Sequence, residues 1–328
     1  MSLAKSIFFC SALLAFVADA QAVTIQWSLV GNPGNAADTV TPNPGFGAVG
    51  YNYNIGTYDV TNSQYAEFLN TKDPTGANTL GLWNGNMANA TFGGINFNAG
   101  NANGSKYTLI SGAQNHPVNF ETWYDTVRFA NWLNNGQGTG DTESGAYTIL
   151  GGTPTPSNGL SITRNAGATV FLPSENEWYK AAYYDPRTTA QGGPPSDSHY
   201  WLYGTSSSST PIASGPTALA NCANYDGLVN NLTDVGAYSG TTSPSGAFDM
   251  AGNVFQWNEA LIVLSRGLRG GSFNIIPTFL QSSQGGGNHP TVTNNNIGFR
   301  VASIPEPSTF ALAAIGFMAL AWRLRRRA

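Results

Sequence analysis

The sequence predicts one loop-rich domain with few helices, framed by two segments that direct export. Three segments open with the side-chain chemistry of helix N-termini, and glycine, asparagine, serine and threonine dominate the stretches between them. With 39 glycines and 18 prolines, turns should interrupt the chain throughout, so regular secondary structure should be sparse. The roughly 280 residues between the export segments are enough to bury a large core in a single domain.

The first 22 residues have the three parts of a secretory signal peptide. Lys5 supplies the positive charge, residues 7–18 form a short apolar run, and Ala20 and Ala22 form an A-x-A cleavage site. The alternative is a buried N-terminal helix, which the start position and the cleavage pattern disfavour. We therefore expect export and removal of residues 1–22.

Three helices are predicted from capping boxes, in which two side chains three residues apart satisfy unpaired backbone N–H groups at the helix start. The pairs are Thr61 with Gln64, Thr122 with Asp125, and Ser174 with Glu177. The inward faces should carry Tyr65, Phe68 and Leu69, then Val127, Ala130 and Leu133, then Trp178, Ala181 and Ala182. Residues 84–103, 136–167 and 188–215 are expected to be surface loops or insertions.

A series of short motifs runs through residues 50–302. The most informative is GAFDMAGNVFQW at 246–257; the others lie at 58–70, 116–132, 171–182, 201–204, 224–227, 269–272 and 298–300. In this order they resemble the motifs of the formylglycine-generating-enzyme family, also called the sulfatase-modifying-factor family. The resemblance implies an α+β fold of the C-type-lectin-like kind, with a few helices packed on short, twisted antiparallel strands and with long loops.

The residues for the family's known redox chemistry are missing. Its oxidases hold copper with two cysteines shortly after the motif at 269–272, whereas residues 273–280 contain none and Cys222 lies upstream. One thiolate cannot supply the soft ligand pair that suits Cu(I). A related branch binds iron through clustered histidines, but His116, His199 and His289 lack helical spacing. Neither copper nor iron is expected, and no catalytic residue is assigned.

The resemblance also implies a calcium site. Its ligands would be Asp249, the backbone carbonyls of Gly252 and Val254, and Gln256. Such oxygen donors are the set that Ca²⁺ prefers. Gln256 stands where the family usually has glutamate, so one carboxylate remains and binding should be weak. The alternative is that Gly252 and Asn253 form only a turn without metal.

Charge is scarce in residues 23–304, where 9 Lys+Arg and 16 Asp+Glu give a net charge of −7. This excludes nucleic acid as a partner, because binding to phosphates needs a basic face. Arg266, Arg269 and Arg300 are expected to tie loops to carbonyls or acids. Residues 281–290, which line the functional groove in the family, are neutral and rich in amides and glycine. They suit a polar neutral partner such as a carbohydrate, or else form a flexible loop.

The C-terminal segment, residues 305–328, has three parts. They are Pro305, Glu306 and Pro307, then an apolar run at 309–322, then Arg323, Arg325, Arg326 and Arg327. The run is shorter than the ~20 residues that span a bilayer comfortably, and the arginines should stay cytoplasmic. This tail resembles the PEP-CTERM sorting signal of Gram-negative bacteria, which implies processing by an exosortase; the alternative is a plain tail anchor.

Three functions remain open for residues 23–304. The first is a non-catalytic binding or matrix protein that meets extracellular polysaccharide or a surface protein. The second is a diverged oxidoreductase or another enzyme of this fold that uses different residues, and the third is a structural surface protein. In each case the chain should cross the inner membrane, be anchored there transiently, and end in the periplasm, on the cell surface or outside the cell.

Overall fold

The computed structural model describes residues 22–39, 45–195 and 198–305. Its three α-helices are α1 (Asn62–Lys72), α2 (Trp123–Asn134) and α3 (Glu175–Tyr183), and each follows one of the predicted capping boxes. In α1, Gln64 N donates to Thr61 Oγ1 at 3.3 Å while Gln64 Oε1 accepts from Thr61 N at 2.9 Å. The three predicted helices are therefore confirmed.

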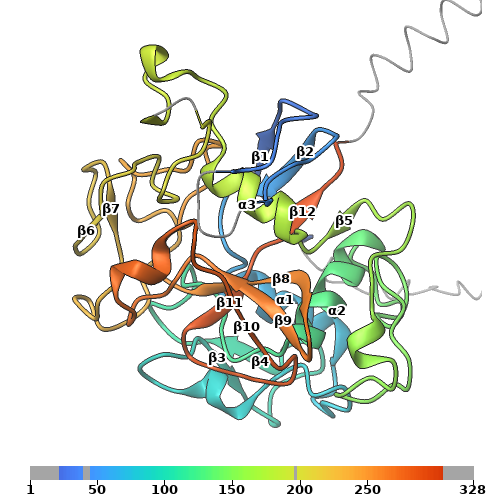
Figure 1. Ribbon diagram of the computed structural model, residues 1–328. Coiled ribbons are helices and arrows are strands. Elements are labelled where there is room, and N and C mark those ends of the chain that lie inside the picture. The colour runs from blue at the N-terminus through green and yellow to red at the C-terminus, as the bar shows by residue number, and fades with distance from the viewer. Residues whose placement is uncertain (1–21, 40–44, 196–197, 306–328) are drawn as a thin grey trace, which may run out of the picture.

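Two four-stranded sheets form the frame (Figure 1). The first has the order β1 (Trp27–Val30), β2 (Tyr53–Gly56), β12 (Ala302–Ser303) and β5 (Val170–Phe171), all antiparallel. It brings the beginning of the domain, in blue, close to its end, in red. The second has the order β10 (Gly286–Asn288), β9 (Ser265–Arg269), β8 (Phe255–Ile262) and β11 (Ile297–Phe299).

Short elements complete the described chain. Two ribbons pair β3 (Ile95–Phe97) with β4 (Tyr107–Leu109), and β6 (Ile212–Ala213) with β7 (Cys222–Ala223). Single turns of 3₁₀-helix are η1 (Gly85–Ala88), η2 (Gly159–Ser161), η3 (Thr189–Gln191) and η5 (Pro277–Leu280). The sequence led us to expect antiparallel strands throughout. Two pairs differ, because β11 runs parallel to β8 and β6 runs parallel to β7.

The core lies between the helices and the sheets, and all nine side chains predicted to face inward are buried. Rings from α1, α2 and β11 meet there; Phe68 and Phe299 each lie within 5.4 Å of Phe129, centroid to centroid. Such aromatic pairs add stability beyond their buried area. This packing holds the second sheet, whose strands carry the candidate site, against the helices.

The segments predicted as loops are pinned rather than free. Residues 84–103 include η1 and β3, residues 136–167 include η2, and residues 188–215 include η3 and β6. Arg128 of α2 holds the second of these through Glu143, with Nε–Oε1 at 2.7 Å. Among the described residues, the helices are all too short or too polar to cross a membrane. The predicted apolar run at 309–322 lies outside them, as do Glu306, Pro307, the tail arginines and residues 1–21.

Candidate functional site

A groove with a volume of about 220 Å³ lies against the second sheet. Its walls come from all four strands of that sheet, β8 to β11, and from η5, so residues between 255 and 297 form the whole lining. It is lined by Phe255, Leu268, Arg269, Phe279, residues 284–288, Asn294, Asn296 and Ile297. The neutral segment 281–290 singled out in the sequence thus forms part of this groove.

Arg269 is the one charged residue that lines the groove, and its guanidinium is fully used inside the protein. Nε donates to Glu175 Oε1 at 2.6 Å, and Nη1 donates to the carbonyls of Ser282 and Gln284 at 2.8 and 2.7 Å. Glu175 Oε2 in turn accepts from Asn258 at 2.7 Å. Glu175 is therefore a structural partner of Arg269, and the groove presents no net charge.

Glycine shapes the floor of the groove. A Cβ on Gly285 would lie 2.8 Å from Cζ of Arg269, so a side chain there would displace the guanidinium. Gly286, next along β10, has open space where its Cβ would be. The chain can thus run close to Arg269 and still leave a shallow, accessible strip of backbone at the edge of the sheet.

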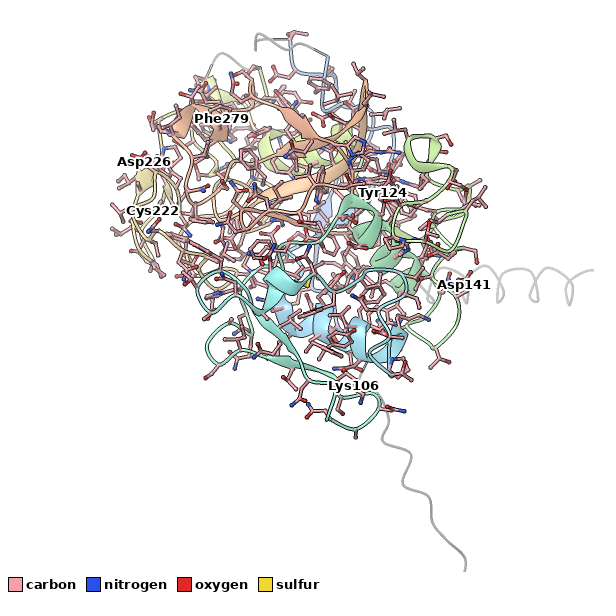
Figure 2. The ribbon with its side chains drawn as sticks, turned by 90° about the horizontal axis from the view of Figure 1, so that it is seen from below. Lys106, Tyr124, Asp141, Cys222, Asp226 and Phe279 are labelled. Carbon is pink, nitrogen blue, oxygen red and sulfur yellow. The ribbon has the colours of Figure 1, made fainter. Side chains whose placement is uncertain are left out.

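Several side chains in the groove are available to contact a ligand through hydrogen bonds or an aromatic face. Among the described residues, the side-chain amides of Gln284 and Asn288 make no hydrogen bond. Phe279 is 42% exposed, and Figure 2 shows it near the edge of the molecule on η5. Phe255 supplies a second, partly buried ring. The groove thus offers aromatic faces beside hydrogen-bonding amides.

The sequence predicted only part of this lining. Phe255, Asn294 and Asn296 were missed because their place in the groove depends on the parallel pairing of β11 with β8. Phe279 was also missed, because the absence of cysteines from residues 273–280 does not reveal which side chains line a groove. An aromatic residue two positions after Pro277 is the signal that could have found it.

The predicted calcium loop is a tight turn in which two of the four predicted ligands, Asp249 and Gln256, use side-chain oxygens in hydrogen bonds. Asp249 and Asn253 have left-handed φ values of 55° and 63°, and a Cβ on Gly252 would lie 2.3 Å from the Asn224 carbonyl oxygen. Asp249 Oδ2 accepts from Gly236 N at 2.7 Å. Val254 is buried in a small cluster of apolar side chains. Glycine is needed at position 252 because the backbone of Asn224 approaches so closely, whether or not an ion binds.

Gln256 is a hub of the core and a poor calcium ligand. Its Oε1 accepts from Trp178 Nε1 at 2.7 Å and from Arg300 Nε at 2.6 Å, while its Nε2 donates to the Asp249 carbonyl at 2.8 Å. A carbonyl oxygen has two lone pairs, and here one partner of that oxygen is itself a cation. An oxygen engaged in this way does not fit Ca²⁺ as a ligand. The calcium site stays a prediction, and the geometry of Gln256 argues against it.

Arg300 also meets a buried carboxylate. Its Nη2 lies 3.0 Å from Asp59 Oδ1, and both side chains are inaccessible to solvent. Burial raises the pKa of Asp59 to about 7 although Arg300 opposes the shift, and burial raises the pKa of Asp249 to about 6. As expected, Arg266, Arg269 and Arg300 all tie loops together; Arg266 does so through the carbonyls of Glu259, Leu160 and Ile162.

The side chains of the remaining candidates do not line the groove, although His289 directly follows the groove residue Asn288. Cys222 is buried beside Tyr238 and Thr241 in a very small hollow. His116 is 3.6 Å from Asp234, whereas His199 Nδ1 lies 3.2 Å from the Asp185 carbonyl oxygen and His289 Nδ1 2.8 Å from Thr291 Oγ1. No cluster of three metal-ligating side chains occurs within the described ranges. A larger hollow of about 430 Å³ lies beside Asp59, with residues 24–26 in its wall.

Comparison with known proteins agrees with this arrangement. Residues 33–304 match the family model of the sulfatase-modifying factor enzyme 1-like domain, and residues 303–327 match that of the PEP-CTERM protein-sorting motif. No curated protein gives a significant match. Both resemblances seen in the sequence are thereby confirmed.

Two solved structures share the fold over nearly their whole length. Variable protein 1 of Treponema denticola is 17% identical, with a TM-score of 0.53, over 87% of this chain and 97% of its own. CarF is 18% identical, with a TM-score of 0.56, over 86% of this chain and 99% of its own. At these identities the likeness concerns the fold alone, and it confirms the predicted loop-rich α+β architecture.

Proposed function

The chain belongs to the sulfatase-modifying factor enzyme 1-like domain family, and on this premise we propose that it is an exported binding module, without catalytic activity, for neutral polysaccharide. The PEP-CTERM motif implies export and processing by an exosortase. We place the processed protein in the periplasm, on the surface or outside a Gram-negative cell. The observation that carries the proposal is the uncharged groove, with its exposed aromatic ring and free amides.

The lining of the groove suits a sugar chain. An aromatic face packs against the apolar C–H face of a pyranose ring, and amides can both donate to and accept from hydroxyl groups. Phe279 supplies the exposed face, while Gln284 and Asn288 supply the amides. A volume of about 220 Å³ with an open edge accommodates a sugar unit and lets the chain continue on either side.

The residues of the domain give little support to the family's redox chemistry. Copper binding there needs two cysteines after the motif at 269–272, and residues 273–280 contain none. Cys222 is buried next to Tyr238, on β7, and does not line the groove. The enzyme hypothesis therefore requires other residues. The ion pair of Glu175 with the groove residue Arg269 is accounted for by its structural hydrogen bonds.

The proposal is tested by titrating the exported protein with a panel of neutral and acidic polysaccharides, using calorimetry or affinity electrophoresis. Phe279→Ala should weaken binding roughly threefold to tenfold, the effect of losing one aromatic contact. Ile276→Ala is the matched control, because Ile276 is 53% exposed just before η5 but does not line the groove. Asn288→Ala should also weaken binding.

The possible results separate the three hypotheses. Binding that depends on Phe279 and is insensitive to salt supports the proposal. A stoichiometric redox metal, or oxygen consumption with a thiol substrate, would replace it with the enzyme hypothesis. Failure to bind any polysaccharide would leave a structural surface protein, and equal loss of binding in the Phe279 and Ile276 variants would locate the ligand elsewhere.

A further inference from the structure

The first described residues of the domain are held by one side chain far along the sequence. Gln137 pairs with both backbone groups of Val23: Val23 N donates to Oε1 at 2.6 Å, and Nε2 donates to the Val23 carbonyl at 2.8 Å. From there the chain is tied down continuously. Gln64 Nε2 donates to the Thr24 carbonyl at 2.9 Å, and Thr57 N donates to the Gln26 carbonyl at 2.8 Å.

The position of Gln137 is fixed by the end of helix α2. Gly136 N donates to the Leu133 carbonyl and Gln137 N donates to the Trp132 carbonyl, at 3.1 and 2.9 Å. This double hydrogen bond is the Schellman motif that closes many helices, with the left-handed residue supplied by Gly136 at a φ of 81°. The amide of Gln137 is therefore presented by a rigid turn and not by a free loop.

The end of α2 lacks the cation that helix C-termini favour. Asp125 occupies its first turn, but no basic residue occupies its last turn. The C-terminal end of a helix carries a partial negative charge from its unpaired carbonyls, so a positive group nearby is stabilising. Val23 N, 2.6 Å from Gln137 Oε1, lies next to this end.

We propose that the turn after α2 is a binding site for the amino terminus of the processed protein, in which Gln137 receives the α-ammonium group of Val23. The inference rests on the A-x-A sequence at Ala20 and Ala22 together with the paired contacts of Val23. Signal peptidase adds water across the Ala22–Val23 peptide bond. The carboxylate leaves on Ala22, and the amine stays on Val23 and takes up a proton.

Processing thus changes the contact at Gln137. Before cleavage Val23 offers a neutral amide N–H; afterwards it offers an ammonium, whose hydrogen bonds are roughly twice as strong. Residues 24–26 form part of the wall of the 430 Å³ hollow beside Asp59. Removal of the signal peptide therefore strengthens the attachment of this wall at the same step that separates the domain from residues 1–22.

The test uses the full protein after export by its own cell. Mass spectrometry gives the first residue, and competitive acetylation across a pH series gives the pKa of the Val23 amine, which is about 7.7–8.0 when unperturbed. In the Gln137→Ala variant the amine should acetylate at least about threefold faster at neutral pH, equivalent to a pKa lower by half a unit. Gln114→Ala, an exposed glutamine outside these contacts, is the control.

A second variant keeps the test decisive if Gln137→Ala folds poorly. Gln137→Glu places a carboxylate beside the amine, so it should raise the pKa of the amine and slow acetylation relative to the native protein. A purely structural role for Gln137 would not predict this opposite shift. The proposal is overturned if the exported chain begins at another residue, or if the Gln137 variants acetylate at the same rate as Gln114→Ala.

Discussion

Arg164 joins two buried carboxylates, and its removal gives the sharpest test of how this loop-rich fold is held together. Its guanidinium reaches Glu177 Oε2 at 2.6 Å and Glu259 Oε2 at 2.7 Å, and Nε and Nη1 make further bonds to the same two acids. The guanidinium also lies over Phe171, 3.5 Å from the ring centroid. One side chain thereby links α3, β8 and β5.

Arg164→Met keeps much of the side-chain volume but leaves both carboxylates without a cation. The side chains of Glu177 and Glu259 are only 1% and 16% exposed. Breaking a buried ion pair on one side typically costs 3–5 kcal/mol, because the remaining charge stays buried; we expect about 3–5 kcal/mol here at pH 7. Arg187→Met is the control, since Arg187 itself is 53% exposed. Its buried partner Asp185 keeps hydrogen bonds from Trp201 Nε1 and from the backbone N of residue 187, so the loss should be smaller, about 1 kcal/mol.

The loss should depend on pH in a direction that follows from the pKa values. Burial tends to raise the pKa of Glu177, but the bonds from Arg164 outweigh it and hold this pKa below its usual value. In the native protein Glu177 therefore stabilises the fold above the unfolded pKa of about 4.3 and loses this effect as pH falls. Glu259 differs, because burial already raises its pKa in the native protein although Arg164 opposes the shift. Without Arg164, burial prevails at Glu177 as well and the pKa of Glu259 rises further, so lowering the pH neutralises both acids and restores stability.

Urea unfolding of the native protein and both variants at pH 7 and pH 5 measures this difference. The free energy of unfolding that Arg164→Met loses relative to the native protein should be smaller at pH 5 than at pH 7 by at least about 1.4 kcal/mol, the free energy of one pKa unit. A deficit that is equal at both pH values, or larger at pH 5, would refute the electrostatic reasoning. A loss in Arg187→Met as large as that in Arg164→Met would show that the ion pairs are not distinguished by burial.

Two further predictions concern the turn of the β8–β9 hairpin and the calcium loop. Val263 is 86% exposed and adopts a left-handed φ of 58°, which is strained for a β-branched residue. Val263→Asn should therefore raise the free energy of unfolding by about 0.5–1 kcal/mol, as measured by urea unfolding. Val263→Ala should raise the free energy of unfolding by less. Because Trp178 and Arg300 occupy Gln256 Oε1, neither chelator nor added calcium should move Tm by more than about 1 °C in calorimetry. A saturable rise in Tm with calcium would contradict this expectation.

The helices could be predicted because their signals are local. Thr61 and Gln64 are three residues apart, and their bonds follow from the backbone geometry of any helix start. The order of the family motifs supplied the rest of the frame, including the groove segment at 281–290. The helices were predicted from residues close in sequence, and the rest of the frame was predicted from the order of the motifs. Neither prediction required knowledge of how the side chains pack.

The partners of Gln256 could not be predicted in this way. Trp178 and Arg300 lie 78 and 44 residues from it in the chain, and only the packed core brings them together. The sequence therefore presented Gln256 as a weakened calcium ligand, whereas the structure presents a side chain with both lone pairs of its oxygen in use. Likewise, Phe255 and Asn296 reach the groove only through the pairing of β8 with β11.

The character of the groove follows from how the domain uses its few cations. Residues 23–304 contain six arginines, and each has partners within the protein: Arg128 with Glu143, Arg164 with Glu177 and Glu259, Arg187 with Asp185, Arg266 with backbone carbonyls, Arg269 with Glu175, and Arg300 with Asp59 and Gln256.

A chain with little regular secondary structure needs such cross-links, because backbone ladders connect only part of it. The same use of arginine affects the groove, because Arg269, the charged residue in its lining, points inward to Glu175 and to the carbonyls of Ser282 and Gln284. An anionic ligand would find no positive charge available in the groove. Because binding there would involve no charge–charge attraction, added salt should have little effect on the affinity. The proposed binding of a neutral partner should therefore be insensitive to salt, and an affinity that fell steeply with salt would place the binding surface elsewhere on the protein.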